Sequence, residues 1–385
     1  MKTIIAIMLC CLLLPFSAFA QADSWQSWVS LKETGKQFFN LKNASADGMQ
    51  VLLVPKQTMS AQPLKKIFVL FPKKSSAYDT ELEQILLYFQ QKKMDASFLL
   101  YFYGKEDEKG MEAMRLAEKE KMDLIFAMGS DSAGFIHKNY RGAGKIPVVT
   151  ICAKDPVLLD QMQNYETGSN TNIAYTSLDM PTTIQLEYLR TLVPDLRNIV
   201  VLYARQNTSA YNAQVKPLAE ACAGTSIAVH ELVVENRATA KQELREKVSE
   251  AYIMLKRRDP ELKKSIFWIT GSTEVFSDIA TIAQNAGKIP VLSLATDVVD
   301  EGDASAAMSI GVGFESNAQL AAFYAWQILS GKAKPGEMPV GIVSPPDIAI
   351  NFRRVKAIGL KIPFSFFERA SIIYDYEGKL RRGQK

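Results

Sequence analysis

The sequence predicts an α/β protein of two similar lobes, each built on a parallel β-sheet. Its 385 residues exceed the roughly 250–300 residues at which a single hydrophobic core stops growing. Apolar runs of strand length alternate with segments of helical periodicity, which is the pattern of parallel sheets covered by helices on both faces. One strand–helix–strand pattern also occurs twice, with AGKIPVV at 143–149 and AGKIPVL at 286–292. The repetition indicates two lobes of the same kind.

The elements expected in the first half follow from these periodicities. The run at 65–72 is uniformly apolar, as in a buried strand, and the next segment places Tyr78, Leu82 and Phe89 on one helical face. The first lobe is therefore expected to contain a strand at 65–72, a helix at 77–93, a strand at 96–103, a helix at 108–121 and the first copy of the repeat.

The second half continues the alternation. We expect a helix at 180–193, with Asp179 as its cap and Pro181 near its first turn. Gly144, Gly287 and Gly331 are expected to end helices in the left-handed conformation. The remaining expected elements are strands at 198–204, 227–234 and 306–314, helices at 238–258 and 316–332, and the second copy of the repeat.

The first 20 residues have the features of a secretory signal peptide. Lys2 precedes an apolar run from Ile4 to Leu14, and the small residues of Ala18-Phe19-Ala20 form a cleavage site. Cys10 and Cys11 lack the small residues that precede a lipidated cysteine. We therefore expect cleavage after Ala20 and export to the periplasm. Two cysteines then remain, Cys152 and Cys222, and we expect them to be separate buried thiols in different lobes.

Composition argues against several classes of function. A formal net charge of +4 is too small to indicate a nucleic-acid partner or a membrane-surface partner. His137 and His230 fall in the middle of predicted elements, and no metal-binding spacing, phosphate loop or nucleophile motif is present. We therefore expect no metal and no cofactor.

Polar and small residues gather where the predicted strands end. In parallel sheets these carboxyl ends and the following helix N-termini bind ligands, and two lobes can bring two such edges together across a cleft. Ser75, Lys154 and Gly271 lie at these edges, and Phe276 and Tyr203 lie near the expected rim. The residues expected to contact the ligand are Ser76, Tyr78, Gly129, Ser130, Asp131, Ser132, Asp155, Asn207, Thr208, Ser272, Thr273, Glu274, Thr296 and Asp297. The alternative role of each single position is to cap its helix.

Catalysis is the competing interpretation of the same edges. Asp131 and Glu274 could form a pair of carboxylates across the cleft. Each also begins a predicted helix, where the helix dipole favours an acid without any catalytic role. We therefore expect a binding protein and not an enzyme.

Four long stretches resemble one known family. They are MGSDSAGFIHKNYRGAGKIPVVTICAKDPV, NIAYTSLDMPTTIQLEYLRTLVPDLRNIVVLYA, ITGSTEVFSDIATIAQNAGKIPVLSLATDVVDEGDASAAMSIG and ILSGKAKPGEMPVGIVSPPDIAINFRRVKAIGLKIP, and together they span about 64–363. The chain is similar to the ABC-transporter substrate-binding proteins that include tryptophan- and tyrosine-binding members, which have the type I periplasmic-binding-protein fold. The resemblance implies a monomer that closes on a small organic ligand, such as an amino acid, and delivers it to an ABC permease. The alternative is a receptor that signals ligand occupancy to a membrane sensor.

The resemblance also implies how the chain is divided. It predicts three crossing strands, at about Thr176, Asp303 and Pro335. The expected parts are a signal peptide at 1–20, an N-terminal extension at 21–63 that matches nothing in the family, lobe one at 64–176 and 303–335, lobe two at 177–302 and 336–366, and a solvated charged tail at 367–385.

Overall fold

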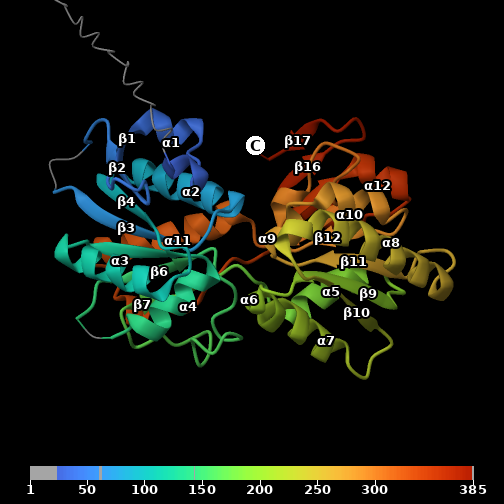
Figure 1. Cartoon of the computed structure of the whole chain (residues 1–385). Coiled ribbons are helices and arrows are strands. Elements are labelled where there is room, and N and C mark those ends of the chain that lie inside the picture. Colours follow the sequence, from blue (N-terminus) through green and yellow to red (C-terminus); the bar gives the residue numbers. More distant parts are fainter. Residues whose placement is uncertain (1–23, 60–62, 143, 384–385) are drawn as a thin grey trace, which may run out of the picture.

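The computed structural model describes residues 24–59, 63–142 and 144–383, which form two α/β lobes lying side by side (Figure 1). The expected signal peptide lies outside the described residues. Both lobes contain a mostly parallel sheet with helices on its two faces, so the predicted fold class is confirmed.

Lobe one contains a seven-stranded sheet in the order β1-β2-β4-β3-β5-β6-β7, in which β3 to β7 are parallel. Its strands are β1 (Phe39–Asn43), β2 (Gln50–Pro55), β3 (Lys65–Phe71), β4 (Ala96–Phe102), β5 (Leu124–Met128), β6 (Val148–Ile151) and β7 (Ile173–Ala174). Its helices are η1 (Ser24–Ser27), α1 (Glu33–Phe38), α2 (Ser76–Gln91), α3 (Asp107–Lys119), α4 (Gly129–Asn139) and α11 (Phe314–Leu329).

Strand β3 shows why this sheet is covered on both faces. Its alternate residues Ile67 and Val69 pack in the same core as Leu82 of α2, whereas Phe68 packs in a second core with Met114 of α3. All these side chains are buried, so a uniformly apolar strand is what this position requires. Helices α2 and α11 lie against each other on the first face.

The N-terminal extension completes lobe one. Strands β1 and β2 form an antiparallel hairpin, and β2 pairs antiparallel with β4 at the edge of the parallel sheet. Trp28 is buried between the rings of Phe71 and Phe102, with centroid distances of 5.5 and 5.4 Å, and its indole N–H donates to the carbonyl of Gly48. The segment that matches no family pattern is thus a packed part of the lobe, which covers an otherwise open sheet edge.

Lobe two contains an eight-stranded sheet in the order β10-β9-β11-β12-β13-β15-β16-β17. Its strands are β9 (Asn198–Ala204), β10 (Ala228–Val234), β11 (Ser265–Ile269), β12 (Val291–Ser293), β13 (Met308–Gly311), β15 (Asp347–Asn351), β16 (Ile372–Tyr374) and β17 (Leu380–Arg382). Its helices are α5 (Thr182–Leu192), α6 (Thr208–Ala210), η2 (Tyr211–Val215), α7 (Lys216–Cys222), η3 (Arg237–Thr239), α8 (Ala240–Arg258), α9 (Thr273–Phe276), α10 (Ile279–Asn285), η4 (Thr296–Val298), α12 (Phe352–Ile358) and α13 (Phe364–Arg369).

The lobes are joined by a short two-stranded sheet in which β8 (Thr176–Ser177) pairs in parallel with β14 (Gly341–Ile342), close to η5 (Pro335–Glu337). The chain also crosses between β13 and α11. The expected crossing near Asp303 differs from this arrangement, because β13 pairs with β12 and β15 in the sheet of lobe two. The return to lobe one therefore occurs between Gly311 and Phe314.

The C-terminal segment also differs from the expected solvated tail. Strands β16 and β17 extend the sheet of lobe two, and the Arg382 guanidinium donates to the carbonyls of Phe367, Glu368 and Ala370 at the end of α13. These orphan carbonyls at a helix C-terminus are favourable partners for a cation. Arg382 of the basic C-terminal run thus stabilises the C-terminus of α13.

Local signals in the sequence are mostly confirmed. Gly287 and Gly331 directly follow the C-caps of α10 and α11 with φ values of +59° and +68°, as helix stops require. Gly144 also has a positive φ, of +76°, but it does not end α4, which stops five residues earlier at Asn139. Asp179 does not cap α5: Pro181 precedes that helix without a side-chain cap, and the Asp179 carboxylate accepts hydrogen bonds elsewhere. Within the described ranges, no helix combines the length and apolarity needed to cross a membrane.

Candidate ligand-binding site between the lobes

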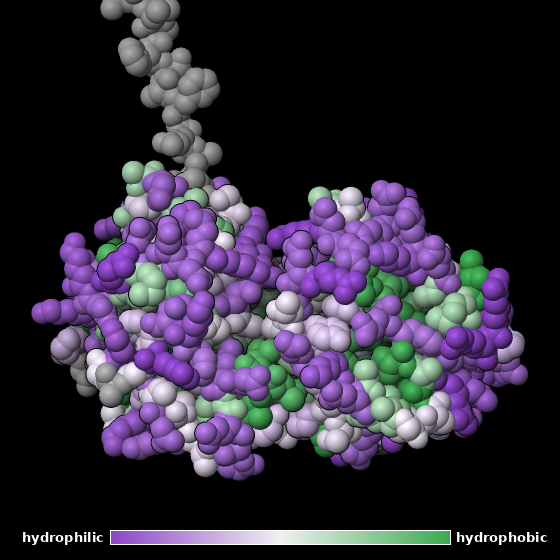
Figure 2. Space-filling model, turned by 60° about the horizontal axis from the view of Figure 1, so that its bottom comes forward, coloured by the Kyte–Doolittle hydropathy of each residue, from purple (hydrophilic) through white to green (hydrophobic). Residues whose placement is uncertain are grey.

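A cavity of about 40 Å³ lies between the two lobes. Figure 2 shows, from another side, the furrow that separates the lobes. Lobe one and lobe two both contribute strand-end loops and helix starts to the cavity wall. The lining residues are Lys73, Ser75, Ala77, Tyr78, Ser130, Asp131, Cys152, Lys154, Leu178, Asn207, Ser209, Gly271, Thr273, Phe276 and Phe314.

The first wall segment is the start of α2, directly after β3. Ser75 precedes the helix in an extended conformation and is 4% exposed, and its hydroxyl has no hydrogen-bond partner among the described residues. Tyr78, in the first turn, is buried with its ring edge-on to Phe71. Its hydroxyl occupies the space where a side chain on Gly129 would lie, because a Cβ there would be 2.1 Å from the Tyr78 oxygen.

The second wall segment follows β5 and β6. The Ser130 hydroxyl, at the start of α4, accepts a hydrogen bond of 2.9 Å from the backbone N–H of Lys154. Asp131, beside it, forms an ion pair of 2.8 Å with Lys105. Cys152 has a left-handed backbone with φ of +54°, and its N–H donates to the side chain of Asn317 in α11. These contacts fix the loop that carries Lys154 into the cleft.

Lobe two supplies the facing edge. Gly271 and Thr273 follow β11, and the Gly271 N–H donates to Gln214, a buried residue of the π-helical turn η2. The Gln214 amide in turn donates to Asp179, whose second oxygen accepts the N–H of Asp155 from lobe one. A buried chain of hydrogen bonds thus connects the edge of lobe two to the crossing segment and to lobe one.

Contacts between described residues cross the cleft directly. The Lys154 ammonium is 3.3 Å from the carbonyl oxygen of Gly271, and the Lys73 ammonium is 3.6 Å from the Glu274 carboxylate. The rings of Phe276 and Phe314 are 6.2 Å apart. These contacts hold the two lobes together around the small cavity.

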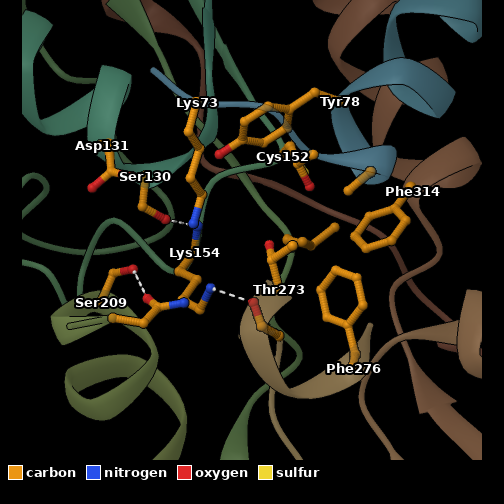
Figure 3. A pocket seen from close by; sticks show the side chains of 15 residues that line it. Lys73, Tyr78, Ser130, Asp131, Cys152, Lys154, Ser209, Thr273, Phe276 and Phe314 are labelled. Atoms are coloured by element: carbon orange, nitrogen blue, oxygen red, sulfur yellow. Dashed lines mark hydrogen bonds between the residues drawn. The ribbon is translucent and has the colours of Figure 1, made fainter. Parts of the chain in front are cut away.

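The cavity has two walls of different character (Figure 3). Tyr78, Phe276 and Phe314 lie on one side, whereas Lys73, Asp131 and Lys154 lie on the other with the serine hydroxyls. Burial lowers the pKa of the Lys154 ammonium, although nearby Asp179 opposes that effect. Burial likewise raises the pKa of Asp179 to about 6, against the charge of Lys154 and its own hydrogen bonds.

Five of the residues proposed from the sequence line this cavity: Tyr78, Ser130, Asp131, Asn207 and Thr273. The Gly-Ser edges of the two repeats therefore do meet at one place. Gly129 lies behind Tyr78, and Glu274 lies beside the cavity, in its ion pair with Lys73.

The other proposed residues have different surroundings. The Ser132 hydroxyl donates to the carbonyl of Leu70 inside lobe one. The Ser272 hydroxyl lies within hydrogen-bond distance of Ala204 N–H and of the Thr270 hydroxyl, and Asp155 accepts from Tyr165 and from its own following turn. Ser76 and Thr208 are exposed. Thr296 and Asp297 line a separate cavity of about 280 Å³ beside Lys32.

Sequence reasoning missed several lining residues. Ser75, Lys154, Gly271 and Phe276 were at the expected edges, but Lys73, Cys152, Leu178, Ser209 and Phe314 were not proposed. Lys73 lies two residues past the end of β3, so its place at a strand end could have indicated a residue of the cleft. Phe314 is the first residue of the helix that follows the crossing from lobe two. Because the crossing was expected near Asp303, Phe314 was not expected at the cleft. Tyr203 faces Glu231 and does not line the cavity.

The described cysteines are buried thiols in separate lobes. Cys152 and Cys222 are both free and buried, in different lobes, as predicted. Burial raises the pKa of the Cys152 thiol well above its usual value. In the part of the chain that the structure describes, no group of three His, Cys, Asp or Glu side chains is arranged to hold a metal ion.

Comparison with known proteins identifies the family. The family model described as "ABC transporter substrate binding protein" matches residues 101–372, which is more than half of the chain. No curated protein matches the sequence.

Solved structures share the fold at low identity. One is a conserved domain protein from Vibrio cholerae, with 19% identity, a TM-score of 0.65, and coverage of 81% of this chain and 100% of the other. A second, from Streptococcus pneumonia, is an ABC domain in complex with L-Trp, with 18% identity, a TM-score of 0.63 and coverage of 81% and 100%. A third is the ligand-free, open form of a substrate-binding protein with adhesive properties from Clostridium difficile, with 20% identity, a TM-score of 0.58 and coverage of 81% and 99%. The chain belongs to the ABC transporter substrate-binding protein family, and its role is the binding of a solute.

Proposed function

We propose that this member of the ABC transporter substrate-binding protein family captures a small organic molecule between its lobes and delivers it to an ABC permease. The observation that carries the proposal is the cavity itself, because equivalent strand ends of two similar lobes line it from opposite sides. Closure of two lobes about crossing strands then encloses the ligand and presents one joined surface to a partner.

The size of the cavity supports a hinge motion. About 40 Å³ accommodates a few water molecules, so an organic ligand enters only when the lobes move apart. Opening breaks the Lys73–Glu274 ion pair, the Lys154–Gly271 hydrogen bond and the Phe276–Phe314 contact. It also strains the hydrogen-bond chain through Asp179 and Gln214. The side chains of the Lys73–Glu274 pair are 18% and 14% exposed, and opening returns both charged groups to water, so hydration replaces part of the attraction that is lost.

The geometry favours binding over catalysis. The proposed carboxylate pair does not form, because Asp131 is paired with Lys105 and Glu274 with Lys73. Neither His137 nor His230 lines the cavity, since His137 contacts Tyr175 and His230 contacts Arg258. The family is generally non-enzymatic, in agreement with this arrangement.

Native mass spectrometry of the purified protein tests the proposed function. We expect one small molecule bound per chain, released by denaturation. Thr273→Gly should weaken its retention, since Thr273 lines the cavity. Ser132→Gly should not, since the Ser132 hydroxyl bonds inside lobe one to the Leu70 carbonyl and to Tyr103. A chain that carries no small molecule, and whose thermal melt is unchanged by extracts of its host, would refute the proposal.

We further propose that the chain works outside the cytoplasm, in the periplasm. Proteins of this family are typically extracytoplasmic, and the first 20 residues have the pattern of a cleaved leader. Sequencing of the exported protein should begin at Gln21. An intact Met1, or an acylated cysteine at the first position, would contradict this.

A further inference from the structure

We propose that the cavity selects an apolar carboxylic acid that lacks an α-amine, and that Ser75 and Lys154 hold its carboxylate. The inference rests on the proposed function of the cavity and specifies its ligand class. It departs from the amino acid that the family resemblance suggested.

The start of α2 is the first reason. This helix is 16 residues long, so its N-terminus carries a positive dipole end and free backbone N–H groups. Ser75, directly before it, is 4% exposed, lines the cavity, and has a hydroxyl without a partner among the described residues. A buried unpaired hydroxyl is costly, and a carboxylate oxygen placed at this helix start would accept from it.

The second reason is a buried cation on the same wall. Lys154 is 6% exposed, and among the described residues no carboxylate lies within ion-pair distance of its ammonium. Its one hydrogen bond is to the Gly271 carbonyl at 3.3 Å, so two of its three donors are left for a ligand. Asp179 is the strongest acidic influence on it, but that carboxylate is occupied by the N–H of Asp155 and the amide of Gln214.

The charges that line the cavity decide the class of ligand. Lys73 is balanced by Glu274, and Asp131 is balanced by Lys105, which leaves Lys154 as the cation without a counterion. A buried ammonium that has no carboxylate within ion-pair distance and still has free donors matches a monoanion, such as a carboxylate. An α-ammonium group would need an acceptor of its own, and Asp131, the one carboxylate among the lining residues, is already paired.

The opposite wall specifies the rest of the molecule. Tyr78, Phe276 and Phe314 face the polar wall across the cavity (Figure 3). A flat or branched apolar group placed between them would be removed from water, while the carboxylate points toward Lys154. The ligand therefore has an anionic end and an apolar end.

Matched pairs of compounds test the absence of the amine. The full mature chain is unfolded in guanidinium, dialysed and refolded to remove any bound molecule, and then titrated by calorimetry. The probes are phenyllactate with L-phenylalanine, 4-hydroxyphenyllactate with L-tyrosine, indole-3-lactate with L-tryptophan, and 2-hydroxyisocaproate with L-leucine. In at least one pair, the hydroxy acid should bind ten times more tightly than its amino acid. Amino acids that bind equally or more tightly, or hydroxy acids that all fail to bind, would overturn the inference.

Variants test the residues with the hydroxy acid that binds best. Lys154→Met, which keeps the length of the side chain, should lower its affinity at least tenfold, and Ser75→Ala about threefold to tenfold. Lys138→Met is the control, because Lys138 is an exposed partner of Asp107 on the outside of lobe one, and its affinity should stay within twofold. Unchanged affinity in both test variants would refute the assignment.

The two proposals fail in different ways. A chain that co-purifies with an amino acid or a sugar keeps the proposed function and overturns this inference. A chain that binds no small molecule overturns both.

Discussion

Asp179 should make the stability of the protein depend on pH in an unusual direction. Its carboxyl group is buried beside the hinge, and burial raises its pKa to about 6 from an ordinary 3.8. Between these two values the folded protein binds a proton that the unfolded chain does not. The contribution of Asp179 to the free energy of unfolding therefore increases as the pH falls through 6, and is complete below 3.8.

The magnitude follows from the size of the shift. Between pH 7.5 and pH 4.5 the folded protein takes up the proton over about 1.5 pH units, and each unit is worth about 1.4 kcal/mol. The stability of the natural chain should therefore rise by about 2 kcal/mol relative to Asp179→Asn over this interval. The variant also weakens the hydrogen bond from Asp155, but that loss is the same at both pH values.

Urea denaturation followed by circular dichroism measures the effect. The free energy of unfolding is extrapolated to water for both proteins at several pH values, and the difference between them is plotted. Subtraction cancels the other acids, including Asp79, whose pKa is also raised to about 6 by burial. A difference that stays constant within 0.5 kcal/mol would show that Asp179 is not buried as an ionised group, and the hydrogen-bond chain through Gln214 would need to be redrawn.

Two further predictions concern stability and the thiols. Gly129→Ala should lower the melting temperature and disturb the cavity, because φ is +78° and the new Cβ would lie 2.1 Å from the Tyr78 hydroxyl. Gly144→Ala is the control, because its φ is +76° and no atom lies within 4 Å of the new Cβ. This variant should lose only the roughly 1–2 kcal/mol of stability that a left-handed non-glycine residue costs. Equal melts of the two variants would mean that the tyrosine moves away freely. In a chain that begins at Gln21, thiol titration should give two groups that react only after denaturation, since Cys152 and Cys222 are buried and unbridged. Thiols that react in the native protein would contradict their burial.

The sequence predicted the layers of the fold because the strands are buried on both faces. The strand at 198–204 has the predicted bounds, and the alternate burial of β3 residues explains why its apolar run is continuous. Lobe boundaries that depend on which strands pair could not be predicted as well from the sequence. Nothing in the local pattern of β13 shows that its neighbours are β12 and β15, so the crossing was expected near Asp303 and lies after Gly311.

The candidate site was predictable as a location but not residue by residue. Ser130 and Ser132 are two positions apart on the same helix start, yet one lines the cavity and the other binds the carbonyl of Leu70. Both are good capping residues, so sequence alone gives them equal weight. Likewise, Thr273 lines the cavity, whereas the hydroxyl of Ser272 accepts a hydrogen bond from Thr270. Which hydroxyl faces the cleft depends on how each helix leaves its strand, and that is set by packing.

The hydrogen-bond chain through Asp179 explains how a hinge can position a binding site. Asp179 lies two residues after β8, so it moves with the crossing segment and belongs to neither lobe alone. One oxygen accepts a hydrogen bond from the N–H of Asp155, next to Lys154, and the other accepts from the side-chain amide of Gln214. The Gln214 side-chain oxygen in turn accepts from the N–H of Gly271. The two backbone edges that meet at the cavity are thus both hydrogen-bonded, directly or through Gln214, to one buried carboxylate in the crossing segment. Rotation about the crossing strands that separates Lys154 from Gly271 must therefore strain or break this chain, which couples the state of the cleft to the hinge.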